Sequence, residues 1–221
     1  MSKNMEFVKD LDKIIILAQG PSWYQCPDYV PGKEGVEIWG SNVIYRDHGV
    51  DRLFFGHDVK SHFFDDDMNL FENMNKLDIP IYTTGIYKQL VNNIQIPVTE
   101  ILEEFKVGFF LNVIAWMQAV AIMQNPKVID MYGVDMRPDA NTEYLVNQKG
   151  TNEFWCGVAM GRGIEVRTTK ESYVMKTKQE GSFPGYHPKV PQNGLASLIP
   201  KEDRNIHALK NYVIRPIGEE I

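Results

Sequence analysis

Small and polar residues follow the apolar runs of this sequence, and their types suit the binding of a polar ligand. Five runs end in this way, at Gln19, Gly20, Pro21 and Ser22; at Ser41 and Asn42; at His57 and Asp58; at Thr84; and at Gly133 and Asp135. Loops at the carboxyl ends of parallel strands also present backbone N–H groups to anions. These amides, hydroxyls and carboxylates therefore suit a ligand built from a base, a sugar and a phosphate.

The first of these loops follows an apolar, β-branched run that begins at Lys13 and stops at Gly-Pro-Ser. Gly20 allows a ligand to approach the backbone closely, and Ser22 supplies a hydroxyl beside it. The same residues also suit an ordinary turn. Because four later runs end in the same small and polar way, we favour a ligand loop.

Several common site motifs are missing from the sequence. It has no Gly-x-x-x-x-Gly-Lys-Ser/Thr loop, no Gly-x-Gly-x-x-Gly fingerprint and no Gly-x-Ser-x-Gly elbow, which disfavours a P-loop triphosphatase, a dinucleotide oxidoreductase and a serine hydrolase. No Cys/His spacing matches a structural zinc site. The aspartates at 65–67 suit the solvated start of a helix better than a metal site. We therefore expect neither a metal nor a resident cofactor.

Strands and helices alternate along the chain. Short apolar runs predict strands from Lys13 and at Val36–Trp39, Asp51–Phe55, Ile79–Thr84, Lys127–Tyr132 and Ile164–Arg167. Helices are expected at Asp65–Leu77, Ile86–Val91, Gly108–Gln124 and Glu153–Met160. This order predicts one Rossmann-like α/β domain over residues 1–168, with a mostly parallel sheet and helices on both faces. Residues 169–221 are expected to form an irregular extension that acts as a lid or a subunit-contact arm.

Overall composition limits the classes of partner. The 221 residues carry a net charge of −6, and the pI is about 5.4, so nucleic acid is not the default partner. Two cysteines and a polar N-terminus favour the cytoplasm over export. Residues 107–123 are apolar enough to suggest a membrane span, but a buried helix explains them better because several strands are available to cover it.

Several of these segments together resemble a known group of proteins. Gly-Pro-Ser after the first strand, Asn42 after the second, and Gly108 before an apolar helix that leads into KVIDMYGVDM resemble the bacterial sialyltransferase-like glycosyltransferases and the related MptE-like proteins. The segment GRGIEV resembles the same group, and the likeness spans about residues 13–168. It implies that Gln19, Gly20, Pro21, Ser22 and Asn42 surround a cytidine nucleotide, and that no metal is needed.

The sequence departs from this group in two places. Ala18-Gln19 stands where the group usually has Gly-Asn or Gly-x, and residues 141–155 hold no histidine where the sialyltransferases have a catalytic one. The candidate general bases are therefore Glu153, Asp135 and His57, with His187 as a further one. Each has a plainer explanation: Asp135 suits a turn, Glu153 suits a helix start, and His57 and its neighbour Asp58 can point apart.

The leading hypothesis is a glycosyltransferase that uses a nucleotide-sugar donor, such as a CMP-sugar, by direct displacement. The residues expected to bind its nucleotide are Gln19, Gly20, Pro21, Ser22, Ser41, Asn42, Asp58, Gly108 and Arg162. One alternative is pyrophosphoryl transfer to a pterin-like alcohol, with Mg²⁺ held by Asp58 and Asp135. Another is a non-catalytic protein that sequesters a nucleotide. The build suits a phage or bacterial accessory protein, and the extension suits contacts in a homo-oligomer.

Overall fold

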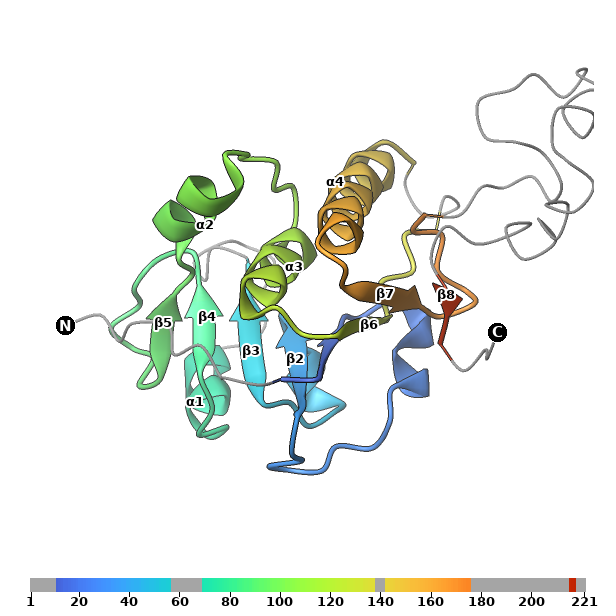
Figure 1. Ribbon diagram of the computed structural model, residues 1–221. Coiled ribbons are helices and arrows are strands. Elements are labelled where there is room, and N and C mark those ends of the chain that lie inside the picture. Colours follow the sequence, from blue (N-terminus) through green and yellow to red (C-terminus); the bar gives the residue numbers. More distant parts are fainter. Residues whose placement is uncertain (1–10, 57–68, 138–141, 176–214, 218–221) are drawn as a thin grey trace, which may run out of the picture.

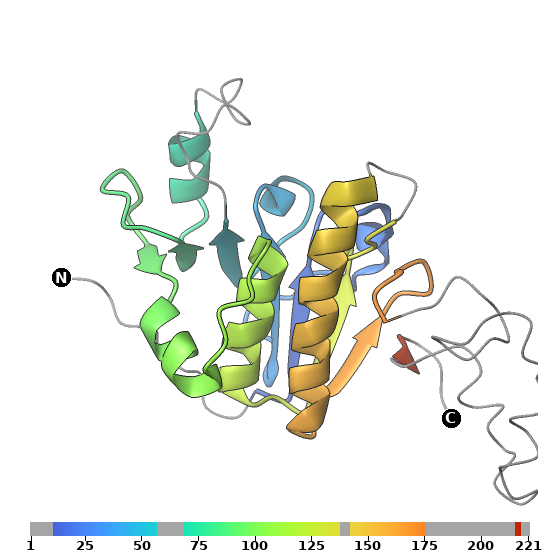
Figure 2. The ribbon, with the colours of Figure 1, turned by 90° about the horizontal axis from the view of Figure 1, so that it is seen from above.

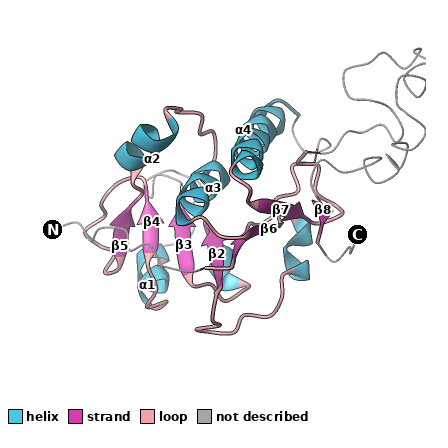
Figure 3. Ribbon diagram, in the orientation of Figure 1, coloured by secondary structure: helices cyan, strands magenta, loops and turns pink. Residues whose placement is uncertain are grey.

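One parallel sheet organises the chain (Figures 1 and 3). The computed structural model describes residues 11–56, 69–137, 142–175 and 215–217. Within them, eight strands pair in the order β5-β4-β3-β2-β1-β6-β7-β8, and every pair is parallel. The strands are β1 Lys13–Leu17, β2 Val36–Ser41, β3 Arg52–Phe55, β4 Ile81–Thr83, β5 Asn93–Gln95, β6 Val128–Tyr132, β7 Glu165–Thr168 and β8 Arg215–Pro216.

Helices cover both faces of this sheet. They are α1 Leu70–Asn75, α2 Val98–Phe105, α3 Val113–Gln124 and α4 Thr142–Gly161, with two short 3-10 helices, η1 Pro21–Gln25 and η2 Ile44–Arg46. The helices α2, α3 and α4 lie on one face, and α1 lies on the other (Figure 1). Figure 2 shows α3 and α4 side by side over the sheet. The α/β Rossmann-like fold and the coverage of both faces are confirmed.

The core explains why β1 is apolar at almost every position. Ile14 and Ile16 pack on the face of α3 and α4, whereas Ile15 and Leu17 pack on the opposite face, against Trp23 of η1. A parallel strand that is buried on both faces needs a continuous apolar run rather than an alternating one. The carboxyl end of β1 is thereby held in the middle of the sheet.

The apolar segment at residues 107–123 contributes a buried helix. Nearly every residue of α3 is buried, because the helix packs between α4 and the strands β1, β2 and β3. Among the described residues, no helix is long and apolar enough to cross a membrane. The helix begins at Val113 rather than at Gly108, because Asn112 caps it by accepting a hydrogen bond from the Ala115 amide (2.9 Å).

Other boundaries differ from the sequence expectation. The helix predicted at Ile86–Val91 is wrong, since these residues form turns in which Asn93 Oδ1 accepts from the Tyr87 amide (2.6 Å). The turns lead into β5, and α2 follows it; neither element was expected. The helix predicted at Glu153–Met160 begins earlier, as α4 at Thr142. The helix predicted at Asp65–Leu77 is α1, and its residues 65–68 lie outside the described part.

The last described residues return to the sheet. Arg215 and Pro216 form β8 beside β7, and the Ile217 amide donates to the Thr168 carbonyl (3.0 Å). Ile217 also packs against the apolar cluster that contains Leu17. Part of the segment expected to be an irregular extension therefore completes one edge of the sheet.

Candidate functional site

The order of the strands marks one place for a ligand. From β1 the chain builds β2 to β5 on one side, and it then returns to pair β6 with the other side of β1. In open parallel sheets the loops on either side of such a switch diverge and leave a crevice at the carboxyl ends of the strands. Here the loops at the switch are Gln19–Ser22 after β1 and Gly133–Asp135 after β6.

Two glycines let these loops approach each other closely. The Gly20 amide donates to the Gly133 carbonyl (2.8 Å), and a Cβ on Gly20 would lie only 2.4 Å from that oxygen. Gly133 has a φ of +68°, and a Cβ there would lie 2.1 Å from the carbonyl oxygen of Ala18. The space that the sequence suggested for a ligand beside Gly20 is thus filled by the other loop.

Ser22 joins the two loops through its hydroxyl and its backbone amide. Its hydroxyl donates to Asp135 Oδ1 and accepts from the Gly133 amide (3.1 Å) and from Thr169 Oγ1 (3.0 Å), and its own amide donates to Asp135 Oδ2 (2.8 Å). A hydroxyl offers one donor and two acceptor positions, so that of Ser22 is saturated. Ser22 and Asp135 are 1% and 3% exposed. We call Ser22, Gly133, Asp135 and Thr169 the Ser22 clamp.

A pocket lies against this clamp. It has a volume of about 360 Å³ and is lined by Pro21, Ser22, Tyr24, Asp135, Arg137, Glu171 and Tyr173. The lining combines one guanidinium, two carboxylates and two phenols. A guanidinium can pair with a phosphate, carboxylates and phenols can hydrogen-bond sugar hydroxyls, and a carboxylate can accept a proton. We call this the switch-point pocket.

The segment after β7 forms one wall of the switch-point pocket. Ser172 Oγ donates to the Val134 carbonyl (2.7 Å), and the Tyr173 amide donates to the Asp135 carbonyl (2.8 Å). These bonds hold Glu171 and Tyr173 beside the loop that follows β6. Tyr24, Arg137, Glu171 and Tyr173 were not among the residues predicted from the sequence. Arg137 comes two residues after Asp135, and Glu171 comes three after the end of β7, so both belong to the same strand-end pattern as the predicted residues.

Of the residues predicted from the sequence, the structure brings Pro21, Ser22 and Asp135 to the pocket wall, with Gly20 directly behind them. Gln19 is exposed in the same loop. Ser41 is buried at the end of β2. Asn42 has a φ of +51°, and its side-chain oxygen accepts from the Gly56 amide (3.3 Å), so it joins the ends of β2 and β3.

Gly108, Arg162 and Glu153 do not line the pocket. Gly108 is exposed in the loop between α2 and α3. Arg162 directly follows α4, three residues before β7 begins, and therefore lies at the amino ends of the strands. There it pairs with Glu104 (Nη2 to Oε1, 2.9 Å) and lies over the Phe105 ring. Glu153 is on α4 and does not line the pocket. His57, Asp58 and His187 lie outside the described residues.

Neither cysteine has a reactive thiol at neutral pH. Burial, followed by the charge of Asp130, raises the pKa of the Cys26 thiol to about 12, and burial raises that of Cys156 to about 12. Neither is a thiolate at neutral pH, and thus neither suits a nucleophile. Across residues 11–56, 69–137, 142–175 and 215–217, no group of three or more His, Cys, Asp or Glu side chains is placed to hold a metal ion.

Comparisons with known proteins give likenesses only at the level of structure. No protein-family model matches the sequence, and no curated protein matches it. Solved structures that resemble it include the sialyltransferase CstII from Campylobacter jejuni in complex with the substrate analogue CMP-3FNeuAc, at 15% identity and a TM-score of 0.45, over 71% of this chain and 79% of that one. The monofunctional α-2,3-sialyltransferase Cst-I from the same organism resembles it at 15% identity and a TM-score of 0.48, over 76% of this chain and 79% of that one. The group that the sequence motifs resemble is thus found among the structural neighbours.

Proposed function

We propose that this chain is a glycosyltransferase that binds a nucleotide-sugar donor in the switch-point pocket and transfers the sugar by direct displacement. The observation that carries the proposal is the chemistry of that pocket, where Arg137 lies with the carboxylates of Asp135 and Glu171 at the carboxyl edge of the sheet. The donor class, a CMP-sugar, follows from the motif resemblance of residues 13–168.

Arg137 is the proposed partner of the donor phosphate. When the bond between the anomeric carbon and the phosphate oxygen breaks, negative charge grows on the departing nucleotide. A guanidinium stabilises that charge through paired hydrogen bonds. The Tyr173 phenol on the same wall supplies a further donor.

The proposed general base is Glu171. In direct displacement the acceptor oxygen attacks the anomeric carbon, the nucleotide leaves with the bonding electrons, and the acceptor proton passes to a carboxylate. Asp135 already accepts two hydrogen bonds from Ser22, which makes it a support for the pocket wall. Glu171 is the other carboxylate of the pocket and comes from its exposed rim.

Nucleotide-dependent thermal stabilisation tests the binding step. We expect CMP to stabilise the protein without Mg²⁺, by about 2.7 kcal/mol at 100 times its Kd. Arg137→Ala should weaken CMP binding at least tenfold, because a charged hydrogen-bond partner of the phosphate is lost. Arg162→Ala is the matched control, since it removes an exposed arginine at the opposite edge, and it should leave CMP binding unchanged.

Other outcomes of the same measurement select other functions. A strict requirement for ATP and Mg²⁺ would replace this proposal with pyrophosphoryl transfer. No stabilisation by CMP, UMP, GDP or ATP would overturn it. If Arg162→Ala, and not Arg137→Ala, lost CMP binding, the site would lie at the other edge of the sheet.

Slow hydrolysis of a CMP-sugar, with water as acceptor, tests the chemical step. Glu171→Gln should keep CMP affinity and lower hydrolysis at least about 100-fold, since an amide cannot take the proton. Glu103→Gln, on the exposed side of α2, is the control and should hydrolyse the donor like the unaltered protein. Tight CMP binding with no hydrolysis or transfer in the unaltered protein would support a sequestering protein instead.

A further inference from the structure

Glu153 contacts the segment that follows β7. It lies on α4, outside the switch-point pocket, and its Oε1 accepts a hydrogen bond from the Met175 amide (2.6 Å). The same oxygen is 3.2 Å from the ammonium of Lys149, one helical turn earlier. The side chain is 29% exposed. Its carboxylate is thus engaged with the segment after β7 and with a cation of its own helix.

That segment is held at both ends of a short span. On one side, Ser172 and Tyr173 bond to the carbonyls of Val134 and Asp135. On the other side, Met175 bonds to Glu153. Between them the Val174 side chain is fully buried in the core. The two pocket residues Glu171 and Tyr173 therefore depend on anchors at the end of β6 and on α4.

The backbone at Met175 adds a reason for the anchor on α4. Its φ is +57°, in the left-handed region that a non-glycine residue rarely adopts. Such a conformation persists only where the surroundings hold it. The bond from the Met175 amide to Glu153 is a charge-assisted contact that can do so.

We propose that Glu153 is a positioning residue, which holds residues 171–175 so that Glu171 and Tyr173 stay on the wall of the switch-point pocket. Its role for catalysis rests on the proposed glycosyltransferase function, whereas its role in holding the segment does not. This assignment differs from the general base suggested by the sequence, because the carboxylate is needed as a hydrogen-bond acceptor and not as a proton acceptor.

A pair of substitutions separates the two roles. Glu153→Gln keeps a side-chain oxygen that can accept from the Met175 amide, but the amide group cannot serve as a base. Glu153→Ala removes the acceptor as well. Positioning therefore predicts that Gln rescues what Ala loses, whereas a catalytic base predicts that both variants are inactive.

Amide hydrogen exchange of the full chain tests the anchor without any nucleotide. Exchange at Met175 should become at least about tenfold faster in Glu153→Ala, because a hydrogen bond to a charged group is lost. It should stay within about threefold in Glu153→Gln and in the control Glu103→Ala. Unchanged exchange at Met175 in Glu153→Ala would overturn the proposal, whether or not the protein binds a nucleotide.

Donor hydrolysis then tests the consequence for the site. Glu153→Ala should lower kcat and raise the KM for a CMP-sugar at least about tenfold, since both Glu171 and Tyr173 are displaced, whereas Glu153→Gln should retain both KM and kcat. If Glu153→Gln instead lost kcat as fully as Glu153→Ala with KM unchanged, Glu153 would be a base and the proposal would fail. If the unaltered protein bound no nucleotide, the proposed function would fail while the exchange result still decided the role of Glu153.

Discussion

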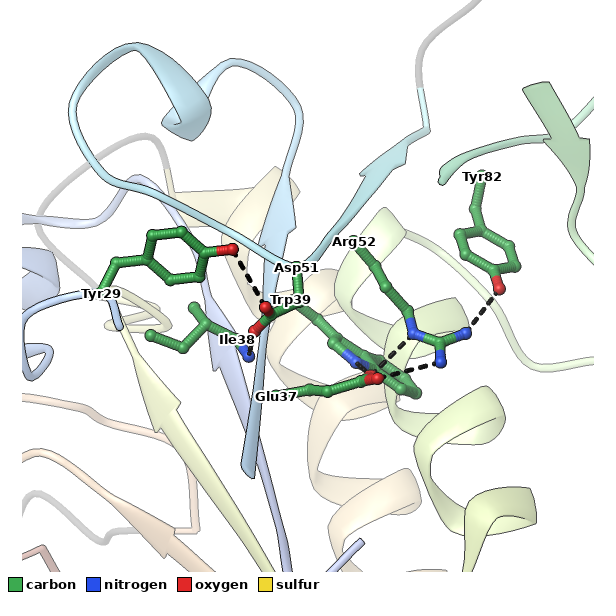
Figure 4. Close-up of polar contacts among 7 residues, drawn as sticks. All are labelled: Tyr29, Glu37, Ile38, Trp39, Asp51, Arg52 and Tyr82. Carbon is green, nitrogen blue, oxygen red and sulfur yellow. Dashed lines mark hydrogen bonds and ion pairs between the residues drawn. The ribbon is translucent and has the colours of Figure 1, made fainter. Parts of the chain in front are cut away.

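Two buried polar clusters join neighbouring strands of the sheet, one at the amino ends of the strands and the other at their carboxyl ends. Arg52, the first residue of β3, donates from Nε and Nη2 to the Glu37 carboxylate (2.7 and 3.1 Å) and from Nη1 to the Tyr82 hydroxyl (2.8 Å), as Figure 4 shows. Trp39 Nε1 also donates to Glu37 (2.6 Å). We call these four residues the Arg52 cluster. The Ser22 clamp makes a comparable set of bonds at the carboxyl ends of β1, β6 and β7.

The difference lies in what surrounds each cluster. Phe54 stacks against Trp39 and Tyr82 of the Arg52 cluster, with ring centroids 5.3 and 4.5 Å apart, and all three rings are fully buried. The Ser22 clamp instead adjoins loops that leave the sheet, and it borders the switch-point pocket. Buried and paired polar groups thus do not identify a site by themselves. What distinguishes the Ser22 clamp is that it lies at the carboxyl ends of the strands and borders a pocket.

The largest expected effect is on the Arg52 cluster. Arg52→Met leaves the partly buried Glu37 carboxylate without its cation, so we expect the free energy of unfolding to fall by about 3 kcal/mol. Urea unfolding measures this change. CMP affinity, measured under conditions where the variant is folded, should be unchanged, because the cluster is remote from the pocket.

The double variant Glu37→Leu with Arg52→Met is the control for that prediction. Replacing both partners leaves no unpaired charge, so it should cost less stability than Arg52→Met alone. A double variant less stable than the single one would show that the attraction between the charges is not what the cluster supplies.

The next effect concerns the contact between the two loops. Gly20→Ala would place a methyl group 2.4 Å from the Gly133 carbonyl oxygen, which is backbone and cannot rotate away. We expect the free energy of unfolding to fall by about 2 kcal/mol and CMP binding to weaken, since the loops must separate. The control is Gly157→Ala on α4, where a Cβ would meet open space, so this substitution should not destabilise the protein. Gly32→Ala is unsuitable as a control because Gly32 has a φ of +67°.

A smaller loss of stability, with a larger effect on the ligand, is expected at Asp135. Asp135→Asn leaves one acceptor for the two hydrogen bonds from Ser22, which costs about 1 kcal/mol. The wall that carries Arg137 should shift, and CMP affinity should fall. Arg52→Met should show the reverse pattern, with a large loss of stability and no loss of affinity. Equal effects on affinity in both variants would remove the distinction between the two clusters.

Three of the strand-end residues named from the sequence, Pro21, Ser22 and Asp135, line the switch-point pocket. The continuous apolar run from Lys13 is typical of a buried parallel strand, and Ser22 and Asp135 follow β1 and β6, which pair directly. The strand β5, with the sequence Asn-Ile-Gln, was missed because it is short and carries no apolar run. Its place depends on pairing with β4 rather than on its own composition.

The rest of the site depends on contacts between residues far apart in the sequence. Glu171 and Tyr173 reach the pocket because bonds to the carbonyls of Val134 and Asp135 fix their segment, and no local pattern shows those bonds. The position of Arg162, by contrast, follows from the order of the elements alone. A helix that leads into a parallel strand ends beside the amino ends of the strands. Arg162, which the sequence motifs suggested as a nucleotide-binding residue, therefore lies away from the loops at the carboxyl ends.

The smallest expected effect is a dependence on pH next to the Arg52 cluster. Asp51 accepts from the Ile38 amide (2.7 Å) and from the Tyr29 hydroxyl (3.0 Å), as Figure 4 shows, and burial raises its pKa above the ordinary value of 3.8. The folded protein therefore holds the Asp51 proton more tightly than the unfolded chain does. The stability that Asp51 contributes is fully present below pH 3.8 and is lost as the pH rises through the raised pKa.

Urea unfolding of the unaltered protein and of Asp51→Asn is measured from pH 3 to pH 7. The quantity compared is the free energy of unfolding of the unaltered protein minus that of the variant. This difference should fall as the pH rises and then become constant, since other carboxyl groups cancel in the subtraction. Tyr29→Phe removes a hydrogen bond that lowers the pKa of Asp51, so it should move the fall to higher pH. A difference that rises with pH would mean that hydrogen bonding to the Asp51 carboxylate outweighs its burial.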